Sequence, residues 1–339
     1  MVVYNIAIVG ATGIVGETIF QLLLERQFPA RKIYLVASKR SEGKKILLGG
    51  KQKKIYNLEE FDFSTIHFAF FAAGEECSSR HAPRAAETGC VVIDNTSCFR
   101  YENDVPLVVP EVNLSALTNY RNRNIIANPN CSTIQLVVAI KPIYDIVEIA
   151  RINVVTYQSV SGAGRKAIRE LEEQTVCLLN GKPIGKLTVF PLQIAFNVLP
   201  HIDVFCDNGY TREEMKMVWE THKIMGNRSL QINPTAVRVP LFFGHSEAVY
   251  IETCRPISLE KVRECLKRAS GIVVIDENNS YPTAASHAKN TDAVFIGRIR
   301  KDIFCSNGIN LWVVANNVRK GAALNSVQIA EALINENFF

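Results

Sequence analysis

The chain has 339 residues, of which 47% are hydrophobic and 21% charged, and its formal net charge is +5. This length predicts about two domains, and the composition is ordinary for a globular enzyme with a sizeable core. Because the basic residues are scattered rather than gathered into a stripe, nucleic-acid binding is disfavoured and sites for small anions fit better. No apolar run reaches the ~20 residues that span a bilayer, so no membrane segment is expected.

The nine cysteines contain no CxxC pair and follow no regular spacing. This pattern disfavours a disulfide framework and a metal site such as zinc, and most of the cysteines lie in apolar runs where they act as small hydrophobes. The N-terminus runs straight into an apolar strand and a glycine turn, without the basic region of a targeting segment. We therefore expect a reduced, cytoplasmic protein.

The first third of the chain alternates short apolar strands with helical patterns. Strands are predicted over 4–10, 32–38, 66–73 and 90–95, and helices over 14–27 and 79–89. This alternation predicts an α/β fold with a parallel, doubly wound sheet. Pro129 breaks the next apolar run, so the first domain is expected to span residues 1–129.

The second region has longer strands and a different order of elements. Strands are predicted over 150–162, 235–254 and 308–317, and helices from Cys131 and over 164–181, 210–226 and 258–271. This mixture predicts an α+β domain over 130–317, with a largely antiparallel sheet and helices on one face. The last segment, 325–339, is an amphipathic helix, and we expect residues 318–339 to pack back on the first domain.

A glycine array follows the first strand directly. Gly10, Gly13 and Gly16 permit a tight turn, close approach of backbone N–H groups to a phosphate, and close packing of the next helix. This context predicts a dinucleotide site. The residues expected to bind the cofactor here are Gly10, Thr12, Gly13, Ile14, Val15, Gly16, Ser38, Arg40 and Ser41.

The end of the second predicted strand indicates which dinucleotide binds. An NAD site usually has an acidic residue about 20 residues beyond the glycines. Ser38, Lys39, Arg40 and Ser41 stand there instead. Hydroxyl and cationic groups suit a 2′-phosphate, so NADP is favoured over NAD, and a solvated basic turn is the alternative.

A cysteine stands at the predicted start of the second domain. Cys131 follows Asn-Pro-Asn, and Ser132 and Thr133 are poor interior helix formers that mark a first turn. A sulfur at a helix N-terminus lies at the positive end of the dipole, which favours the thiolate and can hold an oxyanion. The alternative is a buried structural cysteine.

A nucleophilic thiol needs a base, and histidine is the side chain that titrates near neutrality. Six histidines are present. His245 stands out because a glycine precedes it and Arg238 shares its strand region. A structural histidine is the alternative until other motifs are considered.

Six motifs together resemble the aspartate-β-semialdehyde dehydrogenase family: GATGIVG, NPNCST, YQSVSGAG, EEMK, RVPLFFGH and RKGAALNSVQIAE. The resemblance extends over essentially the whole chain. It implies a Rossmann dinucleotide-binding domain, an α+β domain like that of glyceraldehyde-3-phosphate dehydrogenase, and a homodimer or homotetramer. It also implies reversible, NADP-dependent conversion of L-4-aspartyl phosphate into L-aspartate 4-semialdehyde and inorganic phosphate, on the route to lysine, threonine, methionine and diaminopimelate.

The resemblance implies a role for each matching residue. The catalytic residues are Cys131 as the nucleophile, His245 as the general acid–base, and Gln158, which orients the reacting group. The substrate's α-carboxylate and ammonium are assigned to Arg238 and Glu213, and its phosphate to Arg100 and Lys216. The residues assigned to the nicotinamide are Ser161, Gly162 and Asn317.

Some of these roles also fit the residues' own chemistry. Thr211 and Glu214 form a capping-box pattern, which gives Glu214 a structural task. Glu213 and Lys216 are three residues apart and so share a helix face, where an exposed ion pair is the alternative to a binding site. Arg100 follows a strand at the sheet edge where α/β folds place ligands, and its guanidinium suits phosphate.

Three other functions are weighed against this one. An N-acetyl-γ-glutamyl-phosphate reductase has an acylated substrate amine and would not need Glu213. A malonyl-CoA reductase would need a CoA channel in place of the phosphate-binding cations. A non-catalytic NADP-binding paralogue is disfavoured because Cys131, Gln158 and His245 are all retained.

Overall fold

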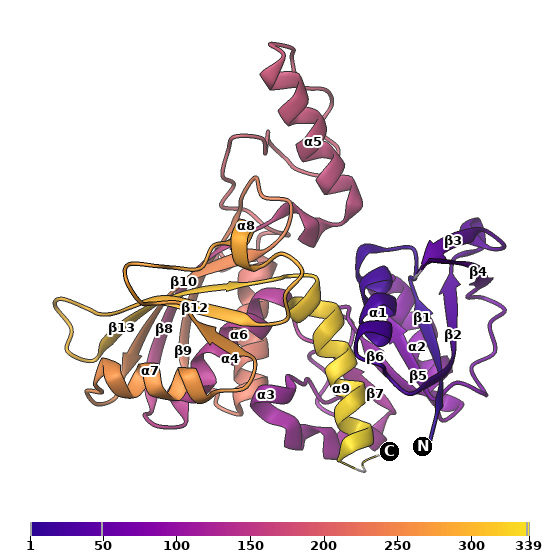
Figure 1. Cartoon of the computed structure of the whole chain (residues 1–339), viewed down its shortest axis with the longest axis horizontal. Helices are drawn as coiled ribbons and strands as arrows, with labels where there is room; N and C mark the ends of the chain where they lie inside the picture. Colours follow the sequence, from indigo (N-terminus) through magenta and orange to yellow (C-terminus); the bar gives the residue numbers. More distant parts are fainter. Residues whose placement is uncertain (1, 49, 337, 339) are drawn as a thin grey trace. The chain divides into compact units, whose positions relative to one another are not determined.

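The chain divides into two compact units in the computed structural model, which describes residues 2–48, 50–336 and 338. The first unit comprises Met1–Asn130 and Ala322–Phe339, and the second comprises Cys131–Gly321 (Figure 1). Each unit has its own sheet with helices packed against it.

The first unit is built on a seven-stranded sheet of order β3-β4-β2-β1-β5-β6-β7. Its strands are β1 (Tyr4–Val9), β2 (Ala30–Ala37), β3 (Lys45–Leu48), β4 (Lys51–Asn57), β5 (Phe68–Phe71), β6 (Val91–Asp94) and β7 (Ile125–Ala127). All neighbours pair in parallel except β3 and β4, which form an antiparallel edge. The carboxyl ends of the parallel strands therefore meet at one edge, where open α/β sheets bind ligands.

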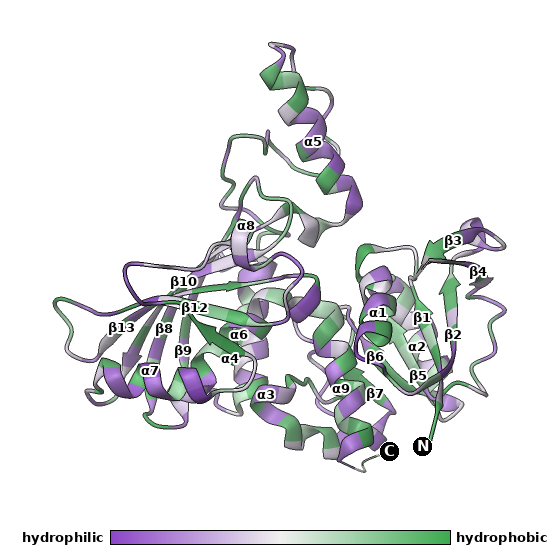
Figure 2. Cartoon of the chain, viewed as in Figure 1, coloured by the Kyte–Doolittle hydropathy of each residue, from purple (hydrophilic) through white to green (hydrophobic). Residues whose placement is uncertain are grey.

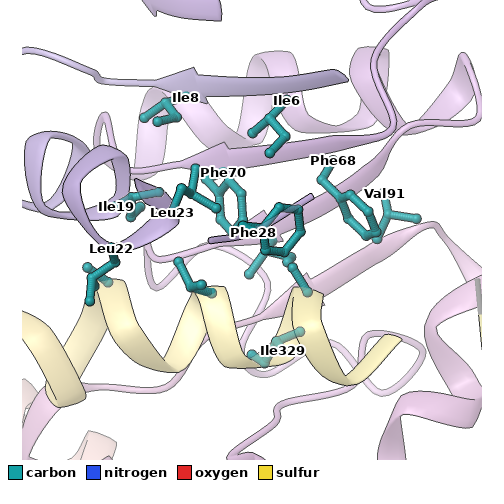
Figure 3. Packing of buried hydrophobic residues seen from close by; sticks show 14 of the residues in the cluster. Ile6, Ile8, Ile19, Leu22, Leu23, Phe28, Phe68, Phe70, Val91 and Ile329 are labelled. Atoms are coloured by element: carbon teal, nitrogen blue, oxygen red, sulfur yellow. The ribbon is translucent and has the colours of Figure 1, made fainter. Parts of the chain in front are cut away.

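The helices of the first unit include one from each end of the chain. They are α1 (Ile14–Glu25), α2 (Glu75–Glu87), α3 (Pro110–Asn113) and α9 (Leu324–Asn335). The apolar core joins Ile8 of β1, Leu22 of α1, Phe70 of β5 and Ile329 of α9 (Figure 3). Arg26 also forms a bidentate ion pair with Glu331, with N–O distances of 2.8 and 2.7 Å. The last helix is thus a component of this unit's core.

The second unit has a six-stranded mixed sheet of order β11-β12-β13-β10-β8-β9. Its strands are β8 (Ile149–Gln158), β9 (Gln231–Arg238), β10 (His245–Thr253), β11 (Ile272–Val274), β12 (Val294–Lys301) and β13 (Gly308–Ala315). The central pairs are antiparallel, whereas β9 and β11 each pair in parallel at an edge. The continuous strand predicted over 235–254 is therefore two strands, with Gly244 in the left-handed region at the end of the turn between them.

Helices α4 (Cys131–Tyr144), α6 (Arg212–Met225) and α7 (Leu259–Arg268) pack together with this sheet. Helix α4 is buried along most of its length, whereas α7 buries only Val262 and Leu266. Figure 2 shows mostly hydrophilic residues along α7. Helices α5 (Arg165–Leu179) and α8 (Ala284–His287) complete the unit. Short helical turns are η1 (Lys39–Ser41) and η2 (Leu114–Asn122) in the first unit and η3 (Val160–Ala163) in the second, while η4 (Arg319–Ala323) includes the point at which the chain passes from the second unit back to the first.

Candidate active site

The turn after β1 has no room for a side chain at Gly10 or Gly16. A Cβ at Gly10 would lie 2.6 Å from the Ala72 carbonyl oxygen, and one at Gly16 would lie 2.4 Å from the Gly10 oxygen. Gly10 also has a φ of +85°, which glycine adopts without strain. Gly13 precedes the first residue of α1, so the N–H groups at the start of that helix are presented at the turn, as in anion-binding sites.

A cavity of about 800 Å³ opens at this edge of the first sheet. Of the residues expected to bind a cofactor, those that line it are Gly10, Thr12, Gly13, Ser38 and Arg40. Outside its lining are Ile14, Val15 and Gly16 of α1 and Ser41 of η1, together with Ser161, Gly162 and Asn317, which belong to the second unit. The stretch from Ala72 to Cys77, with Arg80 and His81, also lines the cavity, although none of these residues was among those expected to bind the cofactor. The signal for this stretch was Gly74, which opens the second strand–helix turn with a φ of +98°.

Arg100 is held at the same edge of the first sheet. Its side chain is buried, and its Nε donates to the carbonyl oxygen of Asn128 at 2.9 Å while Nη2 donates to that of Asn95 at 3.0 Å. Both carbonyls follow the ends of parallel strands. The guanidinium therefore has a fixed orientation near the carboxyl ends of β6 and β7.

Cys131 is the first residue of α4, as the sequence predicted. Its Sγ lies 3.3 Å from Nε2 of His245, the first residue of β10. Gly321 is packed behind the thiol, because a Cβ there would lie 2.8 Å from the Cβ of Cys131. The sulfur is thus at the amino end of a buried helix and in direct contact with one imidazole.

The tautomer of His245 follows from its other ring nitrogen. Nδ1 lies 3.1 Å from the backbone nitrogen of Ser159, and a backbone N–H can only donate. Nδ1 must therefore carry the lone pair, which places the proton of the neutral ring on Nε2, facing the sulfur. Complete burial, with the nearby charge of Arg238, lowers the pKa of His245 to about 3. The ring is accordingly neutral at physiological pH.

A buried amide fixes the backbone around this histidine. Asn317 accepts from the Gly244 N–H at 2.9 Å through Oδ1, and its Nδ2 donates to Ser161 Oγ at 2.9 Å. Ser161 Oγ in turn lies 3.1 Å from Ser159 Oγ. This network ties the start of β10 to the segment after β8, so Asn317 and Ser161 help to hold the imidazole in place.

Arg238 is the last residue of β9 and lies beside the Cys131–His245 pair. Its Nη1 donates to the Ser159 carbonyl at 2.7 Å, and a Cβ at Gly162 would lie 3.2 Å from that same nitrogen. Burial lowers the pKa of Arg238, while the charges of Glu213 and Cys131 oppose that shift. An arginine stays protonated through such shifts, so a fixed positive charge faces both the thiol and Glu213.

A chain of polar contacts continues from Gln158 through α6. Gln158 Nε2 donates to Glu213 Oε1 at 3.1 Å, and Glu213 Oε2 lies 3.1 Å from Lys216 Nζ. Lys216 also contacts Asp203 Oδ2 at 2.7 Å, a partner that sequence reasoning missed. Burial alone lowers the pKa of Lys216, but the two carboxylates outweigh it and raise that pKa.

The helix that carries this pair begins as predicted. Thr211 Oγ1 accepts from the Glu214 N–H at 3.3 Å, and the Glu214 carboxylate accepts from the Thr211 N–H at 2.6 Å, which confirms the capping box. Glu214 also accepts from the Ala236 N–H at 2.9 Å and so joins α6 to β9. The Glu213–Lys216 pair is largely buried, with side-chain exposures of 8% and 13%, rather than solvated.

The described part of the chain contains no cluster of three or more His, Cys, Asp or Glu side chains suited to a metal ion. None of its helices combines the length and hydropathy that crossing a membrane requires.

A dinucleotide-type α/β unit and an α+β unit with a cysteine–histidine pair are the two parts of a semialdehyde dehydrogenase. Family models agree, because the NAD binding domain of semialdehyde dehydrogenases matches residues 5–120 and their dimerisation domain matches residues 140–320. The chain belongs to the aspartate-semialdehyde dehydrogenase family. This confirms the resemblance seen in the sequence motifs and the fold that the resemblance implied.

Relatives and solved structures cover nearly all of the chain. Aspartate-semialdehyde dehydrogenase of Shewanella sp. (strain DB6705) is 58% identical, and 99% of each chain is covered. Aspartate-semialdehyde dehydrogenase 2 of Vibrio cholerae is also 58% identical over 99% of each chain. The crystal structure of aspartate semialdehyde dehydrogenase II of Vibrio cholerae complexed with ASA has a TM-score of 0.96 at 57% identity, covering 99% of each chain. The Candida albicans enzyme with NADP has a TM-score of 0.80 at 26% identity and full coverage.

Proposed function

We propose that the protein catalyses the reversible, NADP-dependent conversion of L-4-aspartyl phosphate into L-aspartate 4-semialdehyde and phosphate, through a thioester on Cys131. The observation that carries this proposal is the contact of 3.3 Å between Cys131 Sγ and His245 Nε2 at the start of α4. The activity named for relatives at 58% identity supports the choice of substrate. We extend to this chain the family's role in lysine, threonine, methionine and diaminopimelate synthesis, with the cytoplasm as its location.

The proposed division of labour follows the two units. The first unit binds the nucleotide at its glycine turn, where the cavity offers hydroxyl and cationic groups from Ser38, Lys39 and Arg40. These groups suit a 2′-phosphate, which supports NADP over NAD. When bound, NADPH supplies the hydride that reduces the thioester. The second unit carries the covalent chemistry.

The thiolate of Cys131 begins the reaction by attacking the acyl phosphate carbonyl and expelling phosphate, which leaves the thioester. The amino end of α4, the charge of Arg238 and the Nε2–H of His245 all stabilise this thiolate. After reduction, the C–S bond breaks to give the aldehyde and the thiolate again. None of these steps leaves a proton on the imidazole, which fits a ring whose pKa is lowered to about 3.

The family resemblance implies that His245 is a general acid–base. We propose that it acts here only as a hydrogen-bond donor, through Nε2–H. Its Nε2–H can bond the thiolate and then the oxyanion that develops on the neighbouring carbon. The Ser159 N–H holds Nδ1 as an acceptor throughout, so the proton stays on the side of the reaction.

Buried charges are proposed to select the substrate. Arg238 suits the α-carboxylate, and Glu213 suits a free ammonium because its carboxylate is buried beside Gln158. An N-acetylated substrate has no charged ammonium to pair with the Glu213 carboxylate. This disfavours N-acetyl-γ-glutamyl phosphate as the substrate. Lys216, with Arg100 by family resemblance, is assigned to the phosphate.

The test is NADPH formation from aspartate semialdehyde with and without phosphate, in the wild type and in Cys131→Ala. We expect phosphate-dependent turnover that falls by more than about a thousandfold in the variant, with NADPH binding retained by fluorescence titration. Cys265→Ala is the matched control and should keep wild-type turnover. Activity of Cys131→Ala within about tenfold of wild type, equal to ~1.4 kcal/mol of barrier, would refute the nucleophile assignment.

We further propose that the second unit forms a homodimer. Large apolar side chains are exposed on α5 and in the segment that follows it, namely Val176, Leu179, Leu192, Phe196, Val198 and Phe205. Glu170 of α5 accepts from the N–H groups of Thr188, Val189 and Phe190, so part of that segment is fixed to the helix. An exposed apolar surface on an ordered scaffold is typical of an interface. Sedimentation of Leu179→Asp should show a monomer, and an unchanged dimer would contradict this surface.

A further inference from the structure

Lys216 is already neutralised by carboxylates of its own chain. Its Nζ lies 2.7 Å from Asp203 Oδ2 and 3.1 Å from Glu213 Oε2, and its side chain is only 13% exposed. A cation that is to receive a phosphate dianion therefore begins with two negative partners. Either one of the two carboxylates must move away from Lys216 when phosphate binds, or phosphate must bind despite the electrostatic repulsion of both.

The two carboxylates differ in how they are held. Glu213 is buried, with 8% of its side chain exposed, and its other oxygen accepts from Gln158. The Asp203 side chain is 30% exposed and reaches Lys216 from the loop before α6. Of the two, Asp203 is the carboxylate that can move to solvent at low cost.

The backbone conformation and hydrogen bonds around Asp203 nevertheless fix the direction of its side chain. Its φ is +70°, a left-handed conformation that asparagine and aspartate tolerate better than other non-glycine residues. Its Oδ1 accepts from the Val204 N–H at 2.9 Å, which turns Oδ2 toward the lysine. The Val204 carbonyl accepts from the Arg212 N–H at 2.8 Å, which fastens the loop to the start of α6.

We propose that Asp203 is a displaceable counter-ion of Lys216, which occupies the lysine until phosphate replaces it and so sets the affinity of the enzyme for phosphate. This inference rests on the proposed function, because it takes Lys216 as a phosphate-binding residue. Asp203 thereby adjusts how tightly phosphate binds and takes no part in the covalent chemistry. If Asp203 only held Lys216 in position, its substitution would have the opposite effect: Lys216 would be less well ordered, and phosphate would bind more weakly.

The decisive variant is Asp203→Asn. Asparagine tolerates the left-handed backbone and keeps an Oδ1 acceptor for Val204, while the substitution removes both the negative charge and the oxygen to which Lys216 donates. We expect the KM for phosphate, measured in the aldehyde-oxidising direction, to fall about fivefold, the effect of a partly exposed ion pair worth ~1 kcal/mol. The KM values for aldehyde and NADP should stay unchanged, and the phosphate effect should shrink in high salt. Asp207→Asn removes the same charge from the same loop and is the matched control.

A second measurement does not depend on turnover. Calorimetric titration of the full-length protein with inorganic phosphate should show about fivefold tighter binding to Asp203→Asn than to wild type or Asp207→Asn. Unchanged or weaker phosphate binding by a folded Asp203→Asn protein would overturn the inference, as would the absence of phosphate binding by both proteins. Lack of turnover with aspartate semialdehyde in the wild type would instead overturn the proposed function, while the titration would still decide the role of Asp203.

Discussion

A buried acid lies close in sequence to the imidazole that contacts the thiol. Glu247 is two residues beyond His245 in β10, so the two side chains share a face of the sheet, and Glu247 is completely buried. Neither carboxyl oxygen makes a hydrogen bond within the described residues, although Gln135 of α4 is close enough to favour the charged carboxylate and so to lower the pKa of Glu247. Burial raises the pKa of Glu247 well above its ordinary value. We therefore expect a protonated carboxyl in the folded protein.

The variant Glu247→Gln keeps the shape and cannot ionise. Below the unfolded-state pKa of about 4.3, both states of the wild type bind the proton, and wild type and variant respond alike to pH. Above it, the unfolded wild type releases a proton that the folded protein retains, so the free energy of unfolding falls by about 1.4 kcal/mol per pH unit until the pH passes the raised pKa. The variant cannot lose stability in this way, so its free energy of unfolding increases relative to that of the wild type as the pH rises.

The assay is urea unfolding of wild type and variant at a series of pH values from 4 upward. The difference in the free energy of unfolding should grow with pH in favour of Glu247→Gln. Glu252→Gln, a partly exposed position in the same strand, should follow the wild type. Parallel curves for Glu247→Gln and wild type would show that Glu247 ionises normally in the fold, and would refute the reasoning.

Three further substitutions test other parts of the structure. Gly321→Ala places a Cβ 2.8 Å from that of Cys131, so kcat should fall by at least about tenfold, and an unchanged kcat would contradict this. Arg40→Ala should raise the KM for NADP about tenfold and leave that for NAD unchanged, whereas equal effects would remove the 2′-phosphate assignment. Thr211→Ala removes the N-cap of α6 and should lower the free energy of unfolding by about 1 kcal/mol in urea, and no loss would show that the cap is redundant.

Local patterns predicted the elements that have either an apolar run or a start signal. The strand before the glycine turn was predicted from its apolar run, whereas the helix from Cys131 and the capped helix α6 were predicted from the residues that begin them. The edge pair β3 and β4 was missed because its segments are rich in lysine and lack an apolar alternation. The turn between β9 and β10 was missed because it reads Val-Pro-Leu-Phe-Phe-Gly and is itself apolar.

The candidate site could be predicted in its residues but not in its contacts. Cys131 and His245 are 114 positions apart, and their contact depends on long-range packing of α4 and β10. The Ser159 N–H that sets the tautomer carries no side-chain signal, since any residue but proline would supply it. Asp203 resembles an ordinary loop aspartate until the fold brings it to Lys216.

The place of α9 in the first core has a consequence for how the protein is made. Ile329 and its neighbours in α9 pack against α1 and the first sheet, yet the roughly 190 residues of the second unit are translated between the last strand of that sheet and α9. At bacterial or eukaryotic elongation rates this delay is on the order of 10–40 s. For that time the first unit has an apolar surface that α9 does not yet cover, and a chain that ends before α9 would be prone to aggregate.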